Sequence, residues 1–327
     1  MAGMGKRMRP HTLTVPKPLI PIAGKPIVHR LVEDIVKVCG QEVEEIAYVV
    51  GHFGEEVENR LIEIAESVGA RGSIHYQEEP LGTAHAVYCA EEILSGNVVV
   101  AFADTLFKAD FTLDHKQEGI IWVQKVPDPR QYGVVKLNSE GYITDFVEKP
   151  QQFVSDLAII GIYYFRDGLA LKREIQYLID NNIQVKGEFQ LTDALENLKK
   201  KGIQFVPGQV SEWLDCGNKN ETVKTNSRYL DYLKDTTLVS EKAIIENSVI
   251  IPPVFVGDNV KITNSVIGPY VSVGSGTQIK EAVIKESIIQ ENAYIADIVF
   301  SNSMIGNHTH IEKTIPNLSV GDYNVIN

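Results

Sequence analysis

The distribution of hydrophobic and polar residues along the chain changes near residue 235. Before that point, short hydrophobic runs alternate with stretches in which apolar residues recur every three or four positions. The runs predict strands, and the stretches predict amphipathic helices. This alternation is typical of a mostly parallel sheet with helices on both faces, in which ligands bind beyond the carboxyl ends of the strands.

In the first part of the chain, the pattern predicts strands that alternate with helices. From about residue 120 it predicts mostly strands. The strands are expected at residues 46–51, 73–77, 98–103, 120–126, 132–137, 143–148 and 157–165, and the helices at 55–68, 82–94, 169–181 and 190–201. A polar helix at 219–233 acts as a connector. The run at 98–103 is hydrophobic throughout, which predicts a strand buried on both faces.

From residue 238 onward, aliphatic residues recur mostly every five or six positions, as at Ile262, Ile267, Val273 and Ile279. Small and polar residues fill the turns between them. Flat sides of six residues, with three sides per turn, are typical of a parallel β-helix whose inward aliphatic side chains stack from coil to coil. This region resembles the left-handed β-helices of the hexapeptide-repeat family. A β-sandwich would instead alternate every two residues and show hairpin turns.

Length and composition fit a soluble protein of two domains, which we place at residues 1–235 and 236–327. The net charge of −12 argues against nucleic acid as a partner. No apolar run approaches the roughly 20 residues that cross a bilayer, and no secretory signal is visible. We therefore expect a cytoplasmic protein without a membrane partner. The three cysteines are too few for a disulfide framework and lack the spacing of a metal site.

The N-terminal segment is basic although the chain as a whole is acidic. Its first 32 residues contain six lysines and arginines and no Asp or Glu, which suits a small polyanion. Gly3 and Gly5 let backbone N–H groups approach phosphate oxygens. Arg7 can direct two donors at a phosphate, and Lys17 supplies a point charge. The alternative for this segment alone is a basic, flexible terminus.

Six short elements follow one another in a characteristic order. They are residues 3–10 with Pro16-Lys17-Pro18, Gln77 with 80–84, Ala103-Asp104-Thr105, Tyr132-Gly133-Val134-Val135, residues 146–150 with Glu148-Lys149-Pro150, and Trp213-Leu214-Asp215 with Gly217. This set resembles the sugar-1-phosphate nucleotidylyltransferases, which include glucose-1-phosphate thymidylyl- and uridylyltransferases and mannose-1-phosphate guanylyltransferases. The resemblance covers about residues 2–218 and implies a Rossmann-like α/β nucleotidyltransferase domain, followed here by the short β-helix.

The resemblance implies a role for each element. The nucleotide contacts would come from Ala2, Gly3, Gly5, Gln77, Gly82 and Thr83. Arg7 would hold the β- and γ-phosphates, Lys17 the α-phosphate and Lys149 the phosphate of the sugar, as catalytic cations; Gly133 and Glu148 would contact the sugar. Asp104 and Asp215 would hold Mg²⁺, a hard cation that prefers oxygen ligands. The substrates would be a nucleoside triphosphate and a sugar 1-phosphate.

The nucleobase is argued from Gln77, because a primary amide offers one donor and one acceptor, which match O4 and N3–H of uracil or thymine. Guanine presents two adjacent donors, and guanylyl-specific members of the family tend to carry Glu at this place. We therefore expect a pyrimidine triphosphate, dTTP or UTP, and glucose 1-phosphate as the commonest sugar substrate of the family. A mannose-1-phosphate guanylyltransferase remains an alternative.

Two departures from the family pattern leave further alternatives open. Lys6 stands where the family usually has Thr, and the phosphate loop begins at residue 1, so the family's first strand is expected to be missing. Without that strand, a non-catalytic subunit that senses nucleotide sugars is an alternative. The β-helix could also belong to a bifunctional nucleotidyl- and acyltransferase with His85, His308 or His310 as a base, but we favour a module for homo-oligomerisation.

Overall fold

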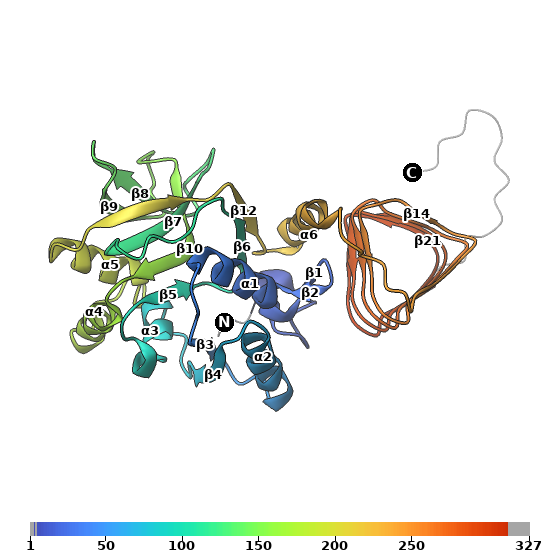
Figure 1. Cartoon of the computed structure of the whole chain (residues 1–327), viewed down its shortest axis with the longest axis horizontal. Coiled ribbons are helices and arrows are strands. Elements are labelled where there is room, and N and C mark those ends of the chain that lie inside the picture. Colours follow the sequence, from blue (N-terminus) through green and yellow to red (C-terminus); the bar gives the residue numbers. More distant parts are fainter. Residues whose placement is uncertain (1–2, 4, 313–327) are drawn as a thin grey trace. The chain divides into compact units, whose positions relative to one another are not determined.

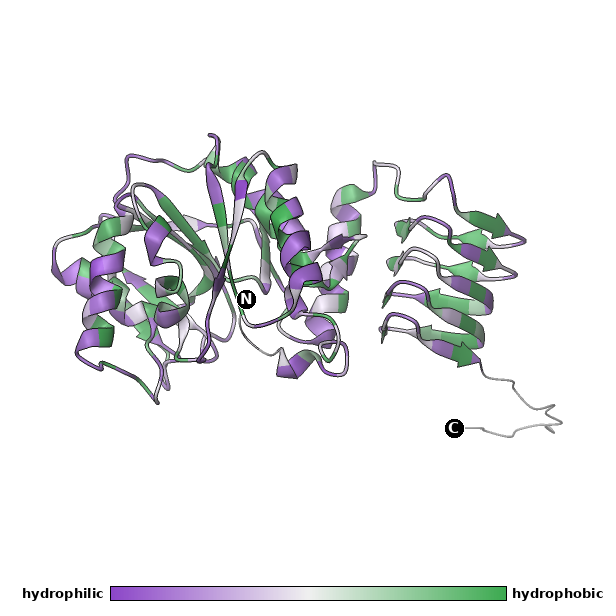
Figure 2. Cartoon of the chain, turned by 90° about the horizontal axis from the view of Figure 1, so that it is seen from below, coloured by the Kyte–Doolittle hydropathy of each residue, from purple (hydrophilic) through white to green (hydrophobic). Residues whose placement is uncertain are grey.

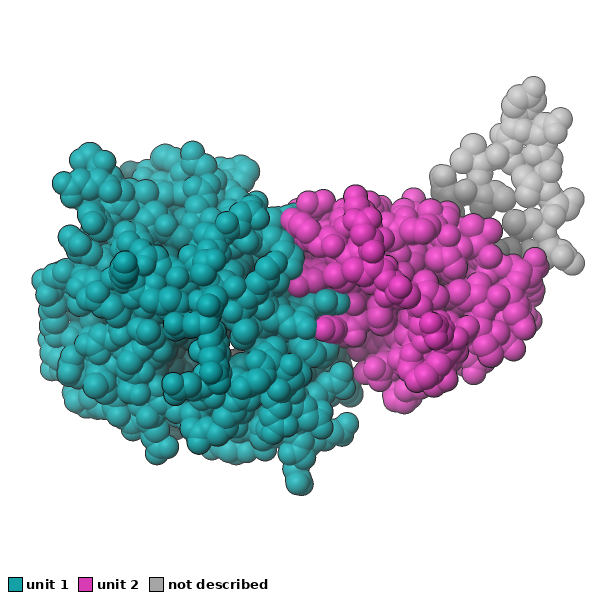
Figure 3. Space-filling model, viewed as in Figure 1, with its two compact units in different colours: residues 1–20, 26–217 teal, residues 21–25, 218–327 magenta. Residues whose placement is uncertain are grey.

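The computed structural model describes residue 3 and residues 5–312. The chain forms two compact units, one of Met1–Ile20 with Pro26–Gly217 and the other of Pro21–Lys25 with Asn218–Asn327 (Figure 3). The division at Gly217 differs from the sequence-based boundary at 235, because the connecting helix groups with the C-terminal unit. Among the described residues, no helix is long and apolar enough to cross a membrane.

The first unit is an α/β domain (Figure 1). Its helices are α1 Ile27–Cys39, α2 Glu55–Ser67, α3 Thr83–Tyr88, α4 Gly168–Asp180 and α5 Leu191–Lys200, with single 3₁₀ turns η1 Lys6–Met8, η2 Lys17–Leu19 and η3 Glu91–Ile93. Its strands are β3 Glu45–Val50, β4 Arg71–Tyr76, β5 Val98–Ala101, β6 Thr105–Lys108, β7 Gly119–Lys125, β8 Gly133–Leu137, β9 Ile143–Glu148, β10 Leu157–Phe165, β11 Phe205–Gln209 and β12 Glu212–Asp215.

The main sheet confirms the predicted α/β class and adds a reversal of one central strand. Its strands lie in the order β11-β7-β10-β8-β9, and β5 also pairs with β10. β11 and β7 are parallel, whereas β10 runs antiparallel to β5, β7 and β8. An apolar core of this unit joins β7 and β10 to α3, α4 and α5.

A smaller parallel pair, β3 with β4, carries its own core with α1 and α2. Among the described strands, β3 pairs only with β4, and β5 pairs only with β10. The strand predicted to be buried on both faces is only partly buried over Val98–Ala101. Full burial was therefore a wrong prediction, and the reason is that a large cavity borders β5.

Most other predicted elements of this unit are present, with boundaries within a few residues. The helix predicted at 82–94 is divided into α3 and η3, because the backbone leaves the helical conformation at Ala90 (φ −106°, ψ 31°). α1 was not predicted from the sequence; it is a strongly amphipathic helix that ends at Gly40 in the left-handed conformation (φ 63°).

The second unit contains a parallel β-helix, as predicted. Its strands are β13 Ile244–Glu246, β14 Val249–Ile250, β15 Val254–Val256, β16 Lys261–Thr263, β17 Val266–Ile267, β18 Val271–Val273, β19 Gln278–Lys285, β20 Ser287–Ile289, β21 Tyr294–Ser301, β22 Met304–Ile305 and β23 His310–Glu312. The register advances by 17, 17, 16 and 16 residues from Ile244 through Lys261, Gln278 and Tyr294 to His310. Coils of 16 or 17 residues explain why some sides have five residues and others six.

Inward aliphatic side chains fill the β-helix. Ile262, Ile279 and Ile295 stack in register and are at most 1% exposed. Asn247 and Asn264 adopt positive φ angles at the coil corners, a conformation that asparagine tolerates better than most residues. Hydrophobic colouring recurs along the stack of coils (Figure 2).

One side of the β-helix is covered by α6 Lys219–Leu233, whose predicted bounds match the structure. Asn218 caps this helix by accepting hydrogen bonds from the N–H groups of Asn220 and Glu221. Asn226 of α6 accepts from the Ser272 hydroxyl on β18 at 2.7 Å and from the Ala23 N–H in the short strand pair β1 Pro21–Ile22 and β2 Lys25–Pro26 at 2.9 Å. These bonds join three segments of the second unit.

Candidate active site

A cavity of about 1520 Å³ lies in the first unit among the glycine-rich N-terminal segment, α1, α3, β3 and β5. The predicted site residues that line it are Gly3, Gly5, Arg7, Lys17, Gln77, Gly82, Thr83 and Asp104. Because these residues come from five separate places in the chain, the fold brings together most of the predicted nucleotide site. Ala2 lies outside the described residues.

The N-terminal segment folds back on itself at the cavity. Gly5 has a φ angle of 54°, and its carbonyl oxygen accepts a hydrogen bond from the Thr12 hydroxyl at 2.9 Å. A Cβ at Gly5 would lie 3.0 Å from Thr12 and 3.3 Å from Lys17, so a side chain there would crowd both. Arg7 follows on η1 with its side chain exposed, which leaves the guanidinium accessible to an anion.

Lys17 and Asp104 form an ion pair 2.8 Å long at the cavity wall. Lys17 begins η2 and is only 9% exposed, whereas the Asp104 side chain is 43% exposed. Asp104 lies between β5 and β6, in the position after a hydrophobic strand where sequence analysis expected it. Therefore a buried cation reaches into the cavity and is neutralised by a carboxylate that remains open to solvent.

Pairing of β6 with β12 brings the second predicted carboxylate alongside the first. Asp215 is in register with Thr105, and the Cys216 N–H donates to the Asp104 carbonyl oxygen at 3.0 Å. Asp215 Oδ1 accepts from the Gly217 N–H at 2.7 Å. A Cβ at Gly217 would lie 2.9 Å from the same oxygen, so the glycine lets the backbone approach the carboxylate.

This donor set fits a hard divalent cation. Asp104 and Asp215 could supply oxygen ligands from neighbouring strand ends, and Mg²⁺ commonly takes one or two protein carboxylates together with water and phosphate oxygens. Within residues 5–312, no group of three or more His, Cys, Asp or Glu side chains could hold a metal ion alone.

Gln77, the proposed base-reading residue, follows β4 and has its amide nitrogen engaged within the protein. Nε2 donates to the Gly82 carbonyl oxygen at 3.1 Å and lies 3.1 Å from His85 Nδ1. With both amide hydrogens directed to these partners, the side-chain oxygen is the group that remains for a ligand. An acceptor alone can bind N3–H of a pyrimidine or N1–H of guanine, so this geometry does not discriminate between them.

The segment around residues 189–191 holds the turn that precedes α3 in place. From the sequence, this segment was expected only to begin a helix. Gly82 has a φ angle of 106°, and a Cβ there would lie 2.5 Å from the Phe189 carbonyl oxygen. The Thr83 hydroxyl accepts from the Leu191 N–H at 3.0 Å. Glu188, beside this clamp, also lines the cavity. The clamp fixes the position of Thr83 at the wall.

The predicted sugar-contacting residues meet across β8 and β9. Gly133 is in register with Glu148, and a Cβ at Gly133 would lie 3.0 Å from Glu148 Oε2. Lys149 Nζ lies 3.2 Å from Glu148 Oε1, with both side chains substantially exposed. Tyr132 packs edge-on against Trp213 with ring centroids 4.9 Å apart. This contact ties the sugar-contacting segment to the strand that carries Asp215.

Asp193 was not identified from the sequence as a candidate site residue. It lies close enough to Glu148 for the Glu148 carboxylate to affect the ionisation of Asp193. Burial raises the pKa of the Asp193 carboxyl, and the Glu148 carboxylate raises it further. Asp193 Oδ2 is buried and has no hydrogen-bond partner in the described part of the chain. No motif distinguishes this residue, since it reads as an ordinary polar position of α5.

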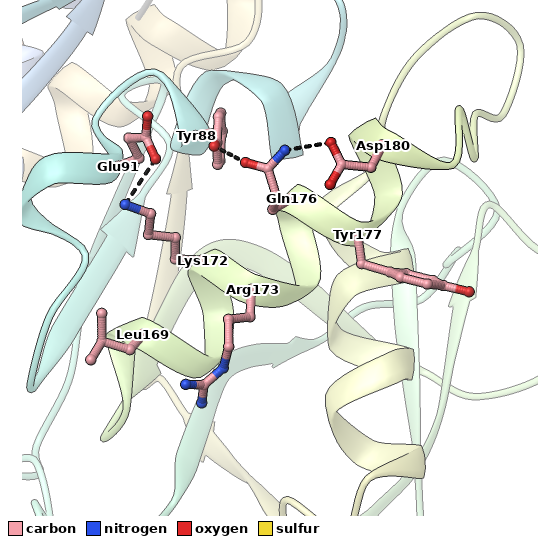
Figure 4. Close-up of a pocket in the computed structure, with 8 residues that line it drawn as sticks. All are labelled: Tyr88, Glu91, Leu169, Lys172, Arg173, Gln176, Tyr177 and Asp180. Atoms are coloured by element: carbon pink, nitrogen blue, oxygen red, sulfur yellow. Dashed lines mark hydrogen bonds and ion pairs between the residues drawn. The ribbon is translucent and has the colours of Figure 1, made fainter.

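A second pocket, of about 440 Å³, lies between α3 and α4 (Figure 4). Its polar groups pair with one another: Lys172 with Glu91 at 2.8 Å, Gln176 with Asp180 at 2.6 Å, and the Tyr88 hydroxyl with Gln176. Because these groups already satisfy one another, the pocket lacks the convergent, open polar atoms of the main cavity.

The histidines considered as acyltransferase bases belong to different units of the chain. His85 lies beside Gln77 in the first unit, whereas His308 and His310 belong to the last described coil of the β-helix. His310 stacks on Tyr294 with ring centroids 4.6 Å apart and lies 3.5 Å from Glu312.

Two family models match the chain. The model described as nucleotidyl transferase covers residues 1–232, and the model described as GlmU-like, C-terminal hexapeptide covers residues 232–297. The second match agrees with the hexapeptide β-helix expected from the repeat.

Curated relatives with three different names match the chain. The chain is 31% identical over 258 residues to the low-salt glycan biosynthesis nucleotidyltransferase Agl11 of Haloferax volcanii, covering 76% of this chain and 70% of the relative. It is 29% identical to the bifunctional protein GlmU of Methanococcus maripaludis, of which it spans 60%, with 77% of this chain covered. It is 30% identical to the mannose-1-phosphate guanylyltransferase catalytic subunit beta of Drosophila pseudoobscura pseudoobscura, over 80% of this chain and 70% of the relative.

A solved structure of UDP-glucose pyrophosphorylase complexed with UDP-glucose resembles the first part of the fold. The TM-score is 0.57 at 25% identity, covering 71% of this chain and 96% of that chain. The names of the Haloferax and Drosophila relatives state nucleotidyl or guanylyl transfer, and the sugar compounds that are named differ, with mannose 1-phosphate in the Drosophila relative and UDP-glucose in the solved structure.

Proposed function

Since the chain belongs to the nucleotidyl transferase family, we propose that it transfers a nucleoside monophosphate from dTTP or UTP to a sugar 1-phosphate, with glucose 1-phosphate as the sugar substrate. The products are an NDP-sugar and pyrophosphate. The observation that carries the proposal is the Lys17–Asp104 ion pair at the cavity wall, with the residue after Asp215 hydrogen-bonded to the Asp104 backbone.

The reaction is an in-line displacement at the α-phosphorus. A phosphate oxygen of the sugar 1-phosphate forms the new P–O bond, the bond from the α-phosphorus to the bridging oxygen breaks, and pyrophosphate leaves with that oxygen. Both reactants are anions, so catalysis depends on holding them in line and neutralising their charge. Arg7 offers an exposed guanidinium beside the cavity for the leaving phosphates.

Lys17 and Asp104 have complementary tasks in this proposal. Asp104 together with Asp215 would hold Mg²⁺, which supplies positive charge to the phosphates when bound. Lys17 could then direct its Nζ from Asp104 toward the α-phosphate. Its burial favours this task, because a poorly solvated ammonium interacts strongly with any anion that enters the cavity.

The sugar end of the substrate would lie near β8 and β9. Glu148 can accept hydrogen bonds from sugar hydroxyls, and Lys149 can bind the sugar phosphate. The absent side chain at Gly133 leaves space next to Glu148 Oε2. The exposed Glu148–Lys149 pair is weak enough to be opened by a ligand.

The test is pyrophosphate release with Mg²⁺ from five nucleoside triphosphates combined with the 1-phosphates of glucose, mannose, galactose and N-acetylglucosamine. Release with dTTP or UTP and glucose 1-phosphate supports the proposal and names the base. Binding of nucleotide without turnover on every pair would contradict it and favour a sensing subunit.

A second candidate function is mannose-1-phosphate guanylyl transfer. The engagement of Gln77 Nε2 with Gly82 and His85 is equally compatible with this function, because the acceptor that remains can bind guanine N1–H. The relative from Drosophila carries that activity in its name. GTP with mannose 1-phosphate in the same assay decides between the two candidates.

A further inference from the structure

Gln77, which lines the main cavity, is held in place at both its backbone and its side chain. Its backbone N–H donates to the carbonyl oxygen of Val50, the last residue of β3, at 2.9 Å. Its side-chain Nε2 lies 3.1 Å from the Gly82 carbonyl oxygen and 3.1 Å from Nδ1 of His85 on α3. His85 is not among the described residues that line the cavity. It therefore acts on a ligand there through the amide of Gln77.

The orientation of the Gln77 amide follows from what its partners can do. A carbonyl oxygen only accepts hydrogen bonds, so the amide atom that faces Gly82 has to be the donor Nε2. The second hydrogen of Nε2 then serves His85 Nδ1, which has to be an acceptor. His85 is therefore neutral and carries its single ring proton on Nε2.

A neighbouring thiol supports this assignment of the ring. Cys89 follows α3 one helical turn after His85, and its Sγ lies 4.0 Å from the same Nδ1. Burial raises the pKa of the Cys89 thiol, so this group keeps its proton at neutral pH. A protonated thiol is a weak donor, and a ring nitrogen without a proton is a suitable acceptor for it. Gln77 and Cys89 thus both present donors to Nδ1.

His85 makes the reversed amide unfavourable. Turning the Gln77 amide over would direct Oε1 at the Gly82 oxygen and at Nδ1 of His85, so two hydrogen bonds would become two contacts between acceptors. Gly82 alone resists this reversal less, because its oxygen also accepts from the Ala86 N–H at 3.1 Å and keeps that bond in either case. We call Gln77, Gly82 and His85 the amide lock.

We propose that His85 is a positioning residue that keeps Oε1 of Gln77 available to the base, so that the amide lock admits bases with a protonated ring nitrogen and rejects the others. The inference rests on the proposed function, because it takes Gln77 as the base-reading residue. N3–H of uracil or thymine and N1–H of guanine can donate to Oε1. Cytosine N3 and adenine N1 present a lone pair at the equivalent place, which an acceptor repels.

Two variants of similar side-chain size test the lock. His85→Asn places an acceptor, Oδ1, at the same distance along the side chain as Nδ1, whereas His85→Leu offers none. Competition binding of UTP, dTTP, GTP, CTP and ATP with Mg²⁺ gives the affinity of each triphosphate, and pyrophosphate release gives KM and kcat separately.

In His85→Leu, the preferences for UTP over CTP and for GTP over ATP should fall about fivefold or more, the change expected for one hydrogen bond. The loss should appear in KM, because the base lies away from the reacting phosphates. His85→Asn should retain most of both preferences. Equal loss in the two variants, or no loss in His85→Leu, would overturn the proposal.

The tautomer of His85 can be measured without a nucleotide. Long-range ¹H–¹⁵N correlation spectra separate protonated from unprotonated ring nitrogens, and the signals that disappear in His85→Asn are those of His85. We expect a proton on Nε2 and none on Nδ1 at neutral pH, and a proton on Nδ1 would overturn the amide lock. Neither this spectrum nor the binding assay needs turnover. A protein without turnover that shows the expected tautomer and binding preferences would therefore contradict the proposed function while supporting the lock.

Discussion

The ion pair between Lys17 and Asp104 predicts an asymmetric response to the loss of either partner. Asp104→Asn removes the carboxylate and leaves an ammonium that is 9% exposed. Breaking a fully buried pair costs roughly 3–5 kcal/mol, but the Asp104 side chain is 43% exposed and solvent screens the pair. We therefore expect Asp104→Asn to lower the free energy of unfolding of the first unit by about 1–2 kcal/mol.

Lys17→Met should cost less, because the carboxylate that remains can be solvated and the methionine keeps most of the apolar contacts of the lysine stem. The expected loss is about 0–1 kcal/mol. The measurement is urea unfolding followed by tryptophan fluorescence. Both tryptophans of the chain, Trp122 and Trp213, belong to the first unit, so the signal reports that unit. If Lys17→Met destabilises more than Asp104→Asn, the burial argument is wrong.

Three further predictions concern the walls of the site. Asp193→Asn should raise stability by about 0.5–1 kcal/mol at pH 7, because burial and Glu148 raise the pKa of the folded carboxyl and its ionisation is therefore costly. The gain should vanish below the unfolded pKa, where both states are protonated; urea unfolding at pH 7 and pH 3 measures this. Gly82→Ala should lower the affinity for nucleoside triphosphate at least tenfold, because its Cβ would meet the Phe189 carbonyl oxygen at 2.5 Å; calorimetric titration measures it. Gln77→Glu should weaken binding of UTP relative to GTP, measured by competition.

Each of these has a result that contradicts it. Equal stability of Asp193→Asn and the parent at pH 7 would mean that Asp193 is better solvated than its buried Oδ2 indicates. Unchanged nucleotide affinity in Gly82→Ala would separate the α3 turn from the nucleotide site. An unchanged preference between UTP and GTP in Gln77→Glu would remove Gln77 from base recognition.

The β-helix and the paired carboxylates could be predicted because each rests on a local pattern. A hexapeptide period reports inward positions directly, and Ile262, Ile279 and Ile295 are buried as the period requires. Asp104 and Asp215 each follow a short hydrophobic segment, so their positions at strand ends could be predicted from the sequence. Asp104 and Asp215 lie near each other because β6 pairs with β12. This pairing brings together residues that are far apart in the chain, and no local sequence pattern predicts it.

Other parts of the site could not be predicted because tertiary packing decides them. The clamp between Gly82 and Phe189 joins a turn to a segment more than a hundred residues later. Asp193 acquires its character from burial near Glu148, and the hydrogen bonds of Gln77 depend on the position of His85. The partial exposure of β5 depends on the adjoining cavity, whereas its sequence indicated burial on both faces.

The central claim is that Lys17, Asp104 and Asp215 form the catalytic centre of a metal-assisted nucleotidyl transfer. The most direct test is pyrophosphate release from dTTP or UTP with glucose 1-phosphate and Mg²⁺, comparing the parent protein with Asp215→Asn and with Glu246→Gln, an exposed carboxylate of the β-helix, as the control. We expect turnover by the parent and the control, and a loss of at least about 100-fold in Asp215→Asn with its fold intact. Equal rates for Asp215→Asn and the parent would contradict it.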